Sequence, residues 1–253
     1  MRKLKGKVAI ISGAGCGFGM SRGFPETFAE NGANLVLNYN HSNSDDMLKF
    51  KKELEKNDIQ CVLVQGDITN QSTSEELVKA AMDTFGKIDI LLNNAGISEP
   101  ALLVDMSYEK WLKTINVNLN SVFLTCKAVL PIMIQQNYGR IINIASQVGQ
   151  KGSVEHCHYC AAKAGMIGFT KALAREVGDK GITVNCIAPG PIKTQLSKNT
   201  SDEWLANKAK ELVIPRFGEI EEVLPSAIFL ASEPDGNLYT GQTLGPNCGD
   251  VML

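Results

Sequence analysis

The sequence lacks an excess of charge of either sign. Its 253 residues carry 25 basic and 27 acidic side chains, a formal net charge of −2, and contain no block of like charges. Proteins that bind nucleic acid or anionic membranes through electrostatics need a basic patch or stripe, so we expect neither partner. Apolar residues make up 44% of the chain and charged residues 21%, which is typical of a folded protein and not of a disordered one.

Long hydrophobic runs are also missing. The basic start of the chain is followed only by the apolar stretch Val8–Ile11, which is too short for the core of a signal peptide. The longest later run, Ala128–Ile134, is too short to cross a bilayer. Seven cysteines are an odd number and lie scattered through apolar segments, which argues against a secreted disulfide framework. We therefore expect a cytoplasmic protein with reduced thiols and no membrane partner.

Short apolar runs alternate with longer amphipathic segments along most of the chain. The runs that suggest strands are Val8–Ser12, Asn34–Asn38, Gln60–Gln65, Ile88–Leu92, Arg140–Ile144, Thr183–Ile187 and, near the end, Gln242–Leu244. The helical patterns include Ser44–Asn57, Ser72–Phe85, Tyr108–Gln136, Tyr159–Val177 and Glu219–Ser232. This alternation predicts an α/β fold with a doubly wound parallel sheet, the Rossmann fold, which binds ligands at the carboxyl ends of its strands. No linker interrupts the pattern, so we expect a single domain over residues 1–253.

A glycine-rich turn follows the first strand run. Gly13, Gly17 and Gly19 fit the spacing G-x-x-x-G-x-G, which leaves room for a phosphate to approach backbone N–H groups at the start of a helix. No G-K-[ST] follows, so a P-loop is excluded. One local rule is broken, because Pro25 falls about two turns into the expected helix, where we predict a kink or a delayed start.

The end of the second strand run bears on which dinucleotide could bind. Dinucleotide folds place an acidic residue about 20 positions after the turn to hold a ribose hydroxyl, but Tyr39 occupies this place. The missing carboxylate removes repulsion against a 2′-phosphate, and Asn40, His41 and Ser42 could donate hydrogen bonds to one. These residues favour NADP(H) over NAD.

Tyr159 and Lys163 are four residues apart in a helical pattern and so share one face. A phenol has a pKa near 10, and an ammonium about 4 Å away would lower it by about three units, into the range useful for acid–base catalysis. Polar and turn residues also end successive strand runs, at Asn93–Gly96, Ser146 and Pro189–Gly190. The fold would bring these groups together at one edge of the sheet.

The order of these motifs resembles the single-domain short-chain dehydrogenase/reductase family, and within it the β-ketoacyl-carrier-protein reductase-like group. The resemblance covers essentially the whole chain. It rests on the glycine turn, Asp67, Asn93-Asn94-Ala95-Gly96, Asn118, Ser146, Tyr159-x-x-x-Lys163, and Pro189-Gly190 with Thr194. It implies an NAD(P)-dependent oxidoreductase that interconverts a carbonyl and a secondary alcohol.

The resemblance also implies a role for each catalytic residue. Tyr159 would exchange a proton with the substrate oxygen, and Ser146 would hold that oxygen. Lys163 would lower the tyrosine pKa and bind the nicotinamide ribose, and Asn118 would hold a water that links Lys163 to solvent. The implied cofactor-binding residues, with the catalytic Tyr159 and Lys163, are Gly13, Gly17, Phe18, Gly19, Tyr39, Asn40, His41, Asp67, Ile68, Asn94, Ala95, Gly96, Pro189, Gly190, Ile192 and Thr194.

The substrate is less well defined by the sequence. Beside Ser146 and Tyr159, the candidate substrate contacts are Gln147 and His156, and polar residues around them suggest a sugar, a polyol or a 3-oxoacyl compound. The resemblance implies a homotetramer built through the helices of Tyr108–Gln136 and Tyr159–Val177. The alternative hypothesis is a nucleotide-binding regulator of the same fold that has lost activity.

The motif His156-Cys157-His158-Tyr159-Cys160 also suggests zinc or thiol redox chemistry. No second Cys or His pair follows at zinc-site spacing, and the motif lacks the context of thioredoxin. We therefore expect no metal, and His156 as a substrate contact is favoured over both alternatives.

Overall fold

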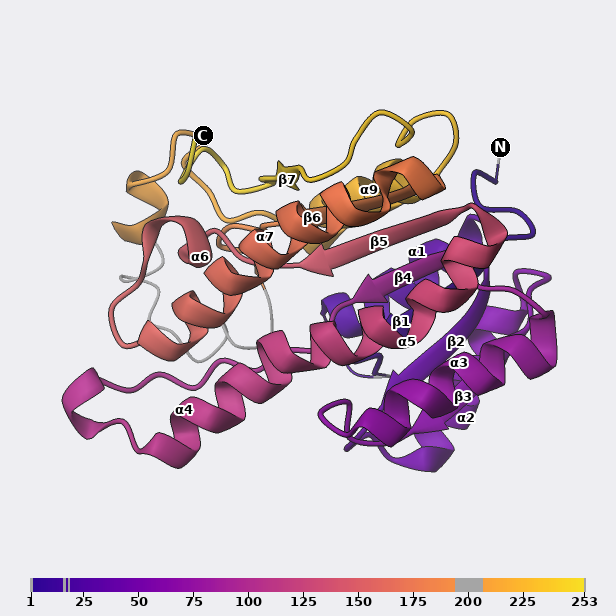
Figure 1. Ribbon diagram of the computed structural model, residues 1–253. Coiled ribbons are helices and arrows are strands. Elements are labelled where there is room, and N and C mark those ends of the chain that lie inside the picture. The colour runs from indigo at the N-terminus through magenta and orange to yellow at the C-terminus, as the bar shows by residue number, and fades with distance from the viewer. Residues whose placement is uncertain (1, 16, 18, 194–206, 253) are drawn as a thin grey trace.

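A seven-stranded parallel sheet forms the centre of the protein (Figure 1). The computed structural model describes residues 2–15, 17, 19–193 and 207–252. The strands lie in the order β3-β2-β1-β4-β5-β6-β7, and the chain passes from β3 at one edge back to β4 beside β1. Their bounds are β1 Val8–Ser12, β2 Asn34–Tyr39, β3 Cys61–Gln65, β4 Ile90–Asn93, β5 Gly139–Ile144, β6 Ile182–Ile187 and β7 Thr243–Leu244. The predicted doubly wound fold is confirmed.

Helices cover both faces of this sheet. One face packs against α1 (Met20–Glu30), α2 (Ser44–Glu55) and α9 (Ile220–Ala231), and the other packs against α3 (Gln71–Phe85), α5 (Ser121–Gln136) and α7 (Cys157–Val177). Side chains of β1 alternate between the two cores: Ala9 and Ile11 belong to the first, and Val8 and Ile10 to the second. Burial on both faces explains why the strand runs are continuously apolar.

Strand β4 begins two residues later than its apolar run predicts. The Gln136 side chain at the end of α5 accepts a hydrogen bond from the Ile88 backbone N–H at 3.0 Å and donates one to the Ile88 carbonyl at 2.7 Å. The backbone of Ile88 is therefore paired with a side chain and not with a neighbouring strand.

The segment Tyr108–Gln136, expected to be one helix, contains three pieces. They are α4 (Tyr108–Ile115), the π-helical turn η2 (Asn116–Asn120) and α5. Among the described residues this segment is long and apolar enough, by length and composition alone, to cross a membrane, but core helices pass the same test. It packs here against α3 and α7. A π-helical turn within a helix is frequent at functional sites, and this one contains the buried Asn118.

Pro25 lies inside α1, which begins at Met20 without delay. Because proline has no backbone N–H, it leaves the Ser21 carbonyl, four residues earlier, without its helical partner. The backbone N–H of Gly15 donates to this carbonyl at 3.0 Å. The proline therefore frees the Ser21 carbonyl to accept a hydrogen bond that holds the glycine-rich turn against the first turn of α1. This role of Pro25 depends on the folded turn, so the local sequence pattern does not reveal it.

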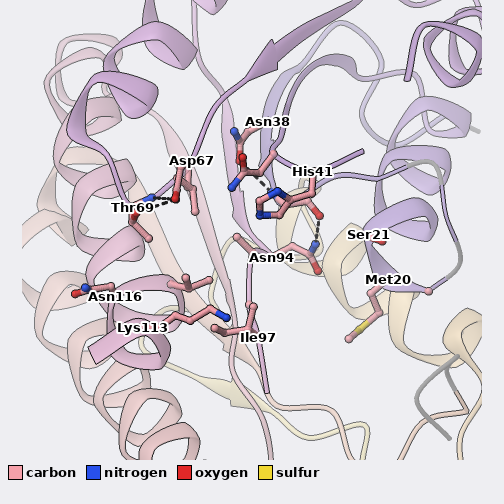
Figure 2. A pocket seen from close by; sticks show the side chains of 17 residues that line it. Met20, Ser21, Asn38, His41, Asp67, Thr69, Asn94, Ile97, Lys113 and Asn116 are labelled. Atoms are coloured by element: carbon pink, nitrogen blue, oxygen red, sulfur yellow. Dashed lines mark hydrogen bonds between the residues drawn. The ribbon is translucent and has the colours of Figure 1, made fainter. Parts of the chain in front are cut away.

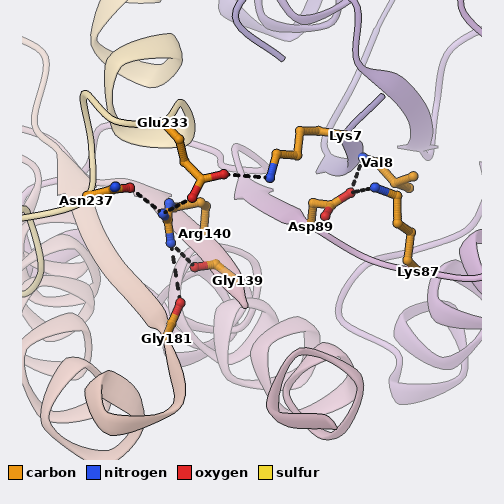
Figure 3. A network of polar contacts seen from close by, with 9 residues as sticks. All are labelled: Lys7, Val8, Lys87, Asp89, Gly139, Arg140, Gly181, Glu233 and Asn237. Atoms are coloured by element: carbon orange, nitrogen blue, oxygen red, sulfur yellow. Dashed lines mark hydrogen bonds and ion pairs between the residues drawn. The ribbon is translucent and has the colours of Figure 1, made fainter. Parts of the chain in front are cut away.

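At the amino ends of the strands, Arg140 is the centre of a polar network (Figure 3). Its guanidinium is buried and donates to the carbonyls of Gly139 and Gly181 and, at 2.8 Å, to Asn237 Oδ1. Glu233 lies 3.5 Å from Arg140 and 2.8 Å from Lys7. This network joins β5 to the chain that follows α9, and lies at the end of the sheet opposite the glycine-rich turn.

Candidate active site

A cavity of about 670 Å³ opens at the carboxyl ends of β1, β2, β3 and β4 (Figure 2). It lies where the strand order reverses, between β1 and β4, which is where doubly wound sheets bind their ligands. Its described lining consists of Gly13, Gly19, Met20, Ser21, Asn38, Asn40, His41, Asp67, Ile68, Thr69, Asn94, Ala95, Gly96, Ile97, Lys113, Asn116 and Val117. Nine of these were expected from the sequence to bind the cofactor.

The turn after β1 is held close to the end of β4. Gly13 has φ +64°, and a Cβ built on it would lie 2.5 Å from Ala95 Cα, so no larger residue fits. Ser12 Oγ accepts hydrogen bonds from the backbone N–H groups of Asn94 and Ala95, and Asn94 Nδ2 donates to the Gly13 carbonyl at 2.9 Å. Ser12 was not expected from the sequence, because its role depends on strands far apart in the chain.

The rest of the turn fits the phosphates of a dinucleotide. A Cβ on Gly17 or Gly19 would meet nothing within 4 Å, so the backbone there is open to a ligand. Gly19 is the N-cap of α1, whose first turn contains no acidic residue, and a helix N-terminus favours an anion. Phe18, another expected contact, lies outside the described residues.

The end of β2 differs from the prediction at one position. Tyr39 is 7% exposed and packs in the core with α1 and α2, so it is not among the residues that line the cavity. Side chains alternate along a strand, so Asn38 faces the other way and lines the cavity. Asn40 and His41, which follow the strand, line it too. Asn38, which was not expected from the sequence, donates from Nδ2 to the Gly66 carbonyl at 2.9 Å and so ties β2 to the end of β3.

Asp67 and Ile68 follow β3 and line the cavity, as expected. Asp67 Oδ1 accepts hydrogen bonds from the Thr69 backbone N–H at 2.9 Å and from the Thr69 hydroxyl at 2.8 Å. The carboxylate is therefore fixed by its own turn, and Ile68, which is 6% exposed, presents an apolar side chain beside it.

Tyr159 and Ser146 meet at the end of β5. Tyr159 lies in the first turn of α7, with its phenol near the Ser146 hydroxyl. Burial raises the pKa of Tyr159 to about 12, and the nearby Ser146 hydroxyl opposes this only in part. The prediction that Lys163 brings this pKa near neutrality is therefore wrong for the protein alone. Lys163 Nζ lies 5.5 Å from the centre of the tyrosine ring and donates to the Ile144 carbonyl at 2.7 Å instead.

Lys163 and Asn118 approach the same glycine. A Cβ built on Gly96 would lie 3.6 Å from Lys163 Nζ and 2.8 Å from Asn118 Oδ1. Burial lowers the pKa of Lys163 to about 8. Asn118 donates both hydrogens of its amide, to the carbonyls of Ile97 and Thr114, so its orientation is fixed. Its Oδ1 is buried and has no partner among the described residues, which leaves an acceptor directed toward Gly96 and the lysine.

A chain of buried polar groups runs beneath this site and joins α5 to α7 through the sheet. Thr125 donates to Asn93 Oδ1 at 2.7 Å, Asn93 donates to Asn143 Oδ1 at 2.8 Å, and Asn143 donates to Thr170 Oγ1 at 2.8 Å. Satisfied buried networks of this kind hold side chains in one arrangement. The chain of hydrogen bonds therefore fixes β4 and β5 relative to the helix that carries Tyr159 and Lys163.

The expected substrate contacts follow Ser146 and precede Tyr159 in the chain. His156 is the N-cap of α7, and its ring meets that of Tyr159 edge-on with centroids 6.3 Å apart. Gln147 follows Ser146 and is only 5% exposed, with an Oε1 that has no partner among the described residues.

The loop after β6 packs close to these residues. The Pro189 carbonyl accepts from the Gln147 backbone N–H at 3.1 Å, and Gly190 packs against Asn247 near the end of the chain. Ile192 pairs with Gly218, whereas Thr194 lies outside the described residues. Over the part of the chain that the structure describes, no group of three or more His, Cys, Asp or Glu side chains is placed to hold a metal ion.

Comparison with known proteins agrees with this arrangement. The sequence profile of the short chain dehydrogenases matches residues 7–204. The chain is 38% identical over 253 residues to a 3-oxoacyl-[acyl-carrier-protein] reductase of Synechocystis, with 100% of both chains covered. It is 39% identical to such a reductase of Vibrio cholerae, with 99% of both covered. It is 41% identical to that of Chlamydia trachomatis, with 97% of this chain and 98% of the relative covered.

The family match extends over most of the chain. The sheet places the motifs of the sequence along its carboxyl edge, and the cavity lies at this edge. The protein belongs to the short-chain dehydrogenase/reductase family and is an NAD(P)-dependent oxidoreductase that interconverts a carbonyl and an alcohol.

Proposed function

We propose that the protein is an NADPH-dependent reductase of 3-oxoacyl thioesters, with Tyr159 as the proton donor. The observation that carries this proposal is the approach of the Tyr159 phenol to Ser146 at the end of β5. Lys163, one turn further along the same helix, approaches Gly96, which lines the cavity that suits a dinucleotide. The substrate class comes from the relatives, which are 3-oxoacyl-[acyl-carrier-protein] reductases. When bound, the cofactor supplies the hydride for the substrate carbon.

Ser146 and Tyr159 would act on the substrate oxygen. The Ser146 hydroxyl would hold the carbonyl, and the Tyr159 phenol would donate its proton as negative charge develops on the oxygen. Because burial raises the pKa of Tyr159 to about 12, the side chain is a neutral phenol at physiological pH. This is the protonation state that carbonyl reduction requires, so the protein alone is prepared for the reductive direction.

Lys163 and Asn118 would return the proton to Tyr159. Lys163 is protonated below its pKa of about 8, and a water held on Asn118 Oδ1 would connect it with solvent. Lys163 would also bind the ribose next to the nicotinamide, as the resemblance implies. Gly96 makes this relay possible, because any side chain there would fill the space between the two groups.

The phosphate-binding residues support a preference for NADPH. Near the end of β2, Asn40 and His41 line the cavity without a carboxylate. Ser21 Oγ and Ser42 Oγ lie 3.5 and 3.6 Å from the position of a Cβ on Gly15, so two hydroxyls flank one point of the turn. These groups can donate hydrogen bonds to a 2′-phosphate.

We expect kcat/KM to be higher with NADPH than with NADH. Replacing Asn40 by Asp should lower kcat/KM for NADPH by about tenfold or more, because a carboxylate near a phosphate costs on the order of 1–4 kcal/mol. The value for NADH should change much less. Steady-state kinetics with both cofactors measure this, and a strong preference of the unaltered protein for NADH would overturn the proposed cofactor.

We also propose a homotetramer formed through α5 and α7. A groove of about 370 Å³ between these helices is lined by Phe123, Cys126, Lys127, Leu130, Pro131, Ile134, Phe169, Ala172, Leu173 and Glu176. Phe123 is 50% exposed and Ile134 is 39% exposed, although both are large apolar side chains of α5. An apolar surface of this kind is typical of an interface.

Light scattering should give four times the chain mass of 27.4 kDa. Replacing Ala172 or Phe123 by Glu should give smaller species, because either change places a charge in the groove. Leu48 on α2 is also 50% exposed but lies away from the groove, so Leu48→Glu serves as a matched control and should remain tetrameric. A monomeric unaltered protein would contradict the proposal.

A screen of 3-oxoacyl thioesters, ketoses, polyols and steroids with both cofactors tests the function. We expect the fastest turnover with a 3-oxoacyl thioester and NADPH. Turnover of ketoses or polyols alone would replace the substrate class and would agree with the polar residues around Gln147 and His156. Cofactor binding without turnover of any substrate would favour an inactive regulator.

A cytoplasmic location belongs to the same proposal and is supported by the six described cysteines, all free thiols.

A further inference from the structure

Two cysteines flank Tyr159 in the first turn of α7. Cys157 is the first residue of the helix and is exposed, and Cys160 is half-buried one turn later. Of the other described cysteines, Cys61, Cys126 and Cys186 are buried, and Cys248 lies near the end of the chain. Among the described cysteines, Cys157 and Cys160 are therefore two neighbouring thiols that an oxidant in solution can reach. The proposed function uses neither of them.

The spacing of this pair is close to that of a disulfide. Residues three apart on a helix have Cβ atoms about 5–6 Å apart, whereas a disulfide requires about 3.5–4.5 Å. Their Cα atoms already fall within the range that a disulfide tolerates, so the bond requires only that one helical turn tighten by about 1–2 Å.

The local structure allows this tightening. Residues 151–155, which precede the helix, are all exposed, and Gly152 and Glu155 have positive φ. The first turn of α7 is closed by the hydrogen bond from the Cys160 N–H to the His156 carbonyl at 2.7 Å. A helix end of this kind opens more readily than the middle of a helix. Tyr159 lies within the same turn, so any change of the turn moves the phenol relative to Ser146.

The two thiols differ in environment. Burial raises the pKa of Cys160, although the backbone N–H of Ser153 donates to its sulfur and opposes the effect. Cys157 is exposed at the first position of the helix, whereas Cys160 is half-buried. Cys157 would thus react first with an external oxidant, and Cys160 would react second.

We propose that Cys157 and Cys160 form a reversible disulfide that inactivates Tyr159, so that the start of α7 is a site of thiol oxidation. The oxidant is a small disulfide. The Cys157 thiolate attacks one of its sulfurs and releases one thiol, and the Cys160 thiolate then attacks Cys157 and releases the second. The two cysteines lose two electrons and two protons, and the small disulfide gains them. The effect on activity rests on the proposed function, whereas formation of the bond does not.

Oxidised glutathione, followed by dithiothreitol, tests this proposal. Trypsin cleaves after Lys151 and Lys163, so the peptide of residues 152–163 contains both cysteines and no other. We expect this peptide to lose the mass of two hydrogens on oxidation and to regain it on reduction. Reductase activity should fall on the order of a hundredfold, the effect of a displacement of about 1 Å at a catalytic group, and dithiothreitol should restore it.

Variants separate this site from the other thiols. Cys157→Ser and Cys160→Ser should each abolish the intramolecular disulfide and the reversible loss of activity. Cys248→Ser, the matched control at another incompletely buried thiol, should retain both. A glutathione adduct without closure, a bond to Cys248, or a closed disulfide with full activity would each overturn the proposal. If the disulfide forms in a protein that reduces none of the substrates tested, the oxidation site stands and the proposed function fails.

Discussion

Replacing Tyr159 by Phe should lower kcat/KM for the carbonyl substrate by about 10²–10⁴-fold, the usual contribution of a general acid. The phenol that contacts Ser146 is lost, but the ring that fills the site remains. Cofactor binding should change much less, because only one of the expected cofactor contacts loses a hydroxyl and the residues that line the cavity are untouched. Steady-state kinetics and NADPH fluorescence titration measure the two effects separately.

Tyr239→Phe is the matched control. This tyrosine is 39% exposed and its ring packs edge-on against Phe229, with centroids 4.7 Å apart and away from the cavity. Its loss of a hydroxyl should leave kcat/KM within experimental error. If Tyr159→Phe retained most of the activity, Tyr159 would not be the proton donor, whatever the substrate.

Replacing Lys163 by Met should reduce turnover on a similar scale, because the buried ammonium of the proton relay is lost. It should also change the pH dependence of stability. Burial lowers the pKa of Lys163 from 10.5 to about 8 in the folded protein, so between these values the unfolded chain binds the proton more tightly. The free energy of unfolding contributed by Lys163 therefore rises with pH across this window.

Urea unfolding of both proteins at a series of pH values isolates this contribution. The difference in unfolding free energy, unaltered protein minus Lys163→Met, should increase by about 3 kcal/mol from pH 8 to pH 10.5. Groups that do not interact with Lys163 titrate alike in both proteins and cancel in the difference. Lys171→Met, which changes an exposed lysine of the same helix, should show no such increase. A difference that is flat with pH would contradict a buried, destabilised ammonium at Lys163.

Much of the fold was predictable because a parallel sheet covered on both faces makes its strands apolar throughout. The run Val8–Ser12 coincides with β1, and the other strands differ from their predicted runs by one or two residues at one or both ends. Ile88 shows why the ends are harder to predict. It is as apolar as Ile90, where the strand begins, but its backbone is bonded to the side chain of Gln136, 48 residues away. Sequence patterns contain no information on such distant partners.

The site was predictable to a similar extent. Motifs at strand ends converge because parallel strands share one carboxyl edge, so the order of the motifs alone places the glycine turn, Asp67, Asn94 and Ser146 together. Alternation along β2 directs Tyr39 into the core and brings Asn38 to the cavity instead, which the sequence pattern did not predict. Ser12 and Asn38 could not be found, since each bonds to a strand that is distant in the chain.

Local periodicity and the order of the motifs were enough to establish the succession of strands and helices and the family, and to predict the residues with the chemistry. The electrostatics and the accessibility of those residues came from tertiary packing. Packing raises the pKa of Tyr159 through burial, directs Lys163 to the Ile144 carbonyl, and leaves Asn118 Oδ1 without a partner among the described residues. It also exposes Cys157 beside Tyr159. Burial and long-range hydrogen bonds depend on which distant segments pack together, and these contacts between distant segments exist only in the folded chain.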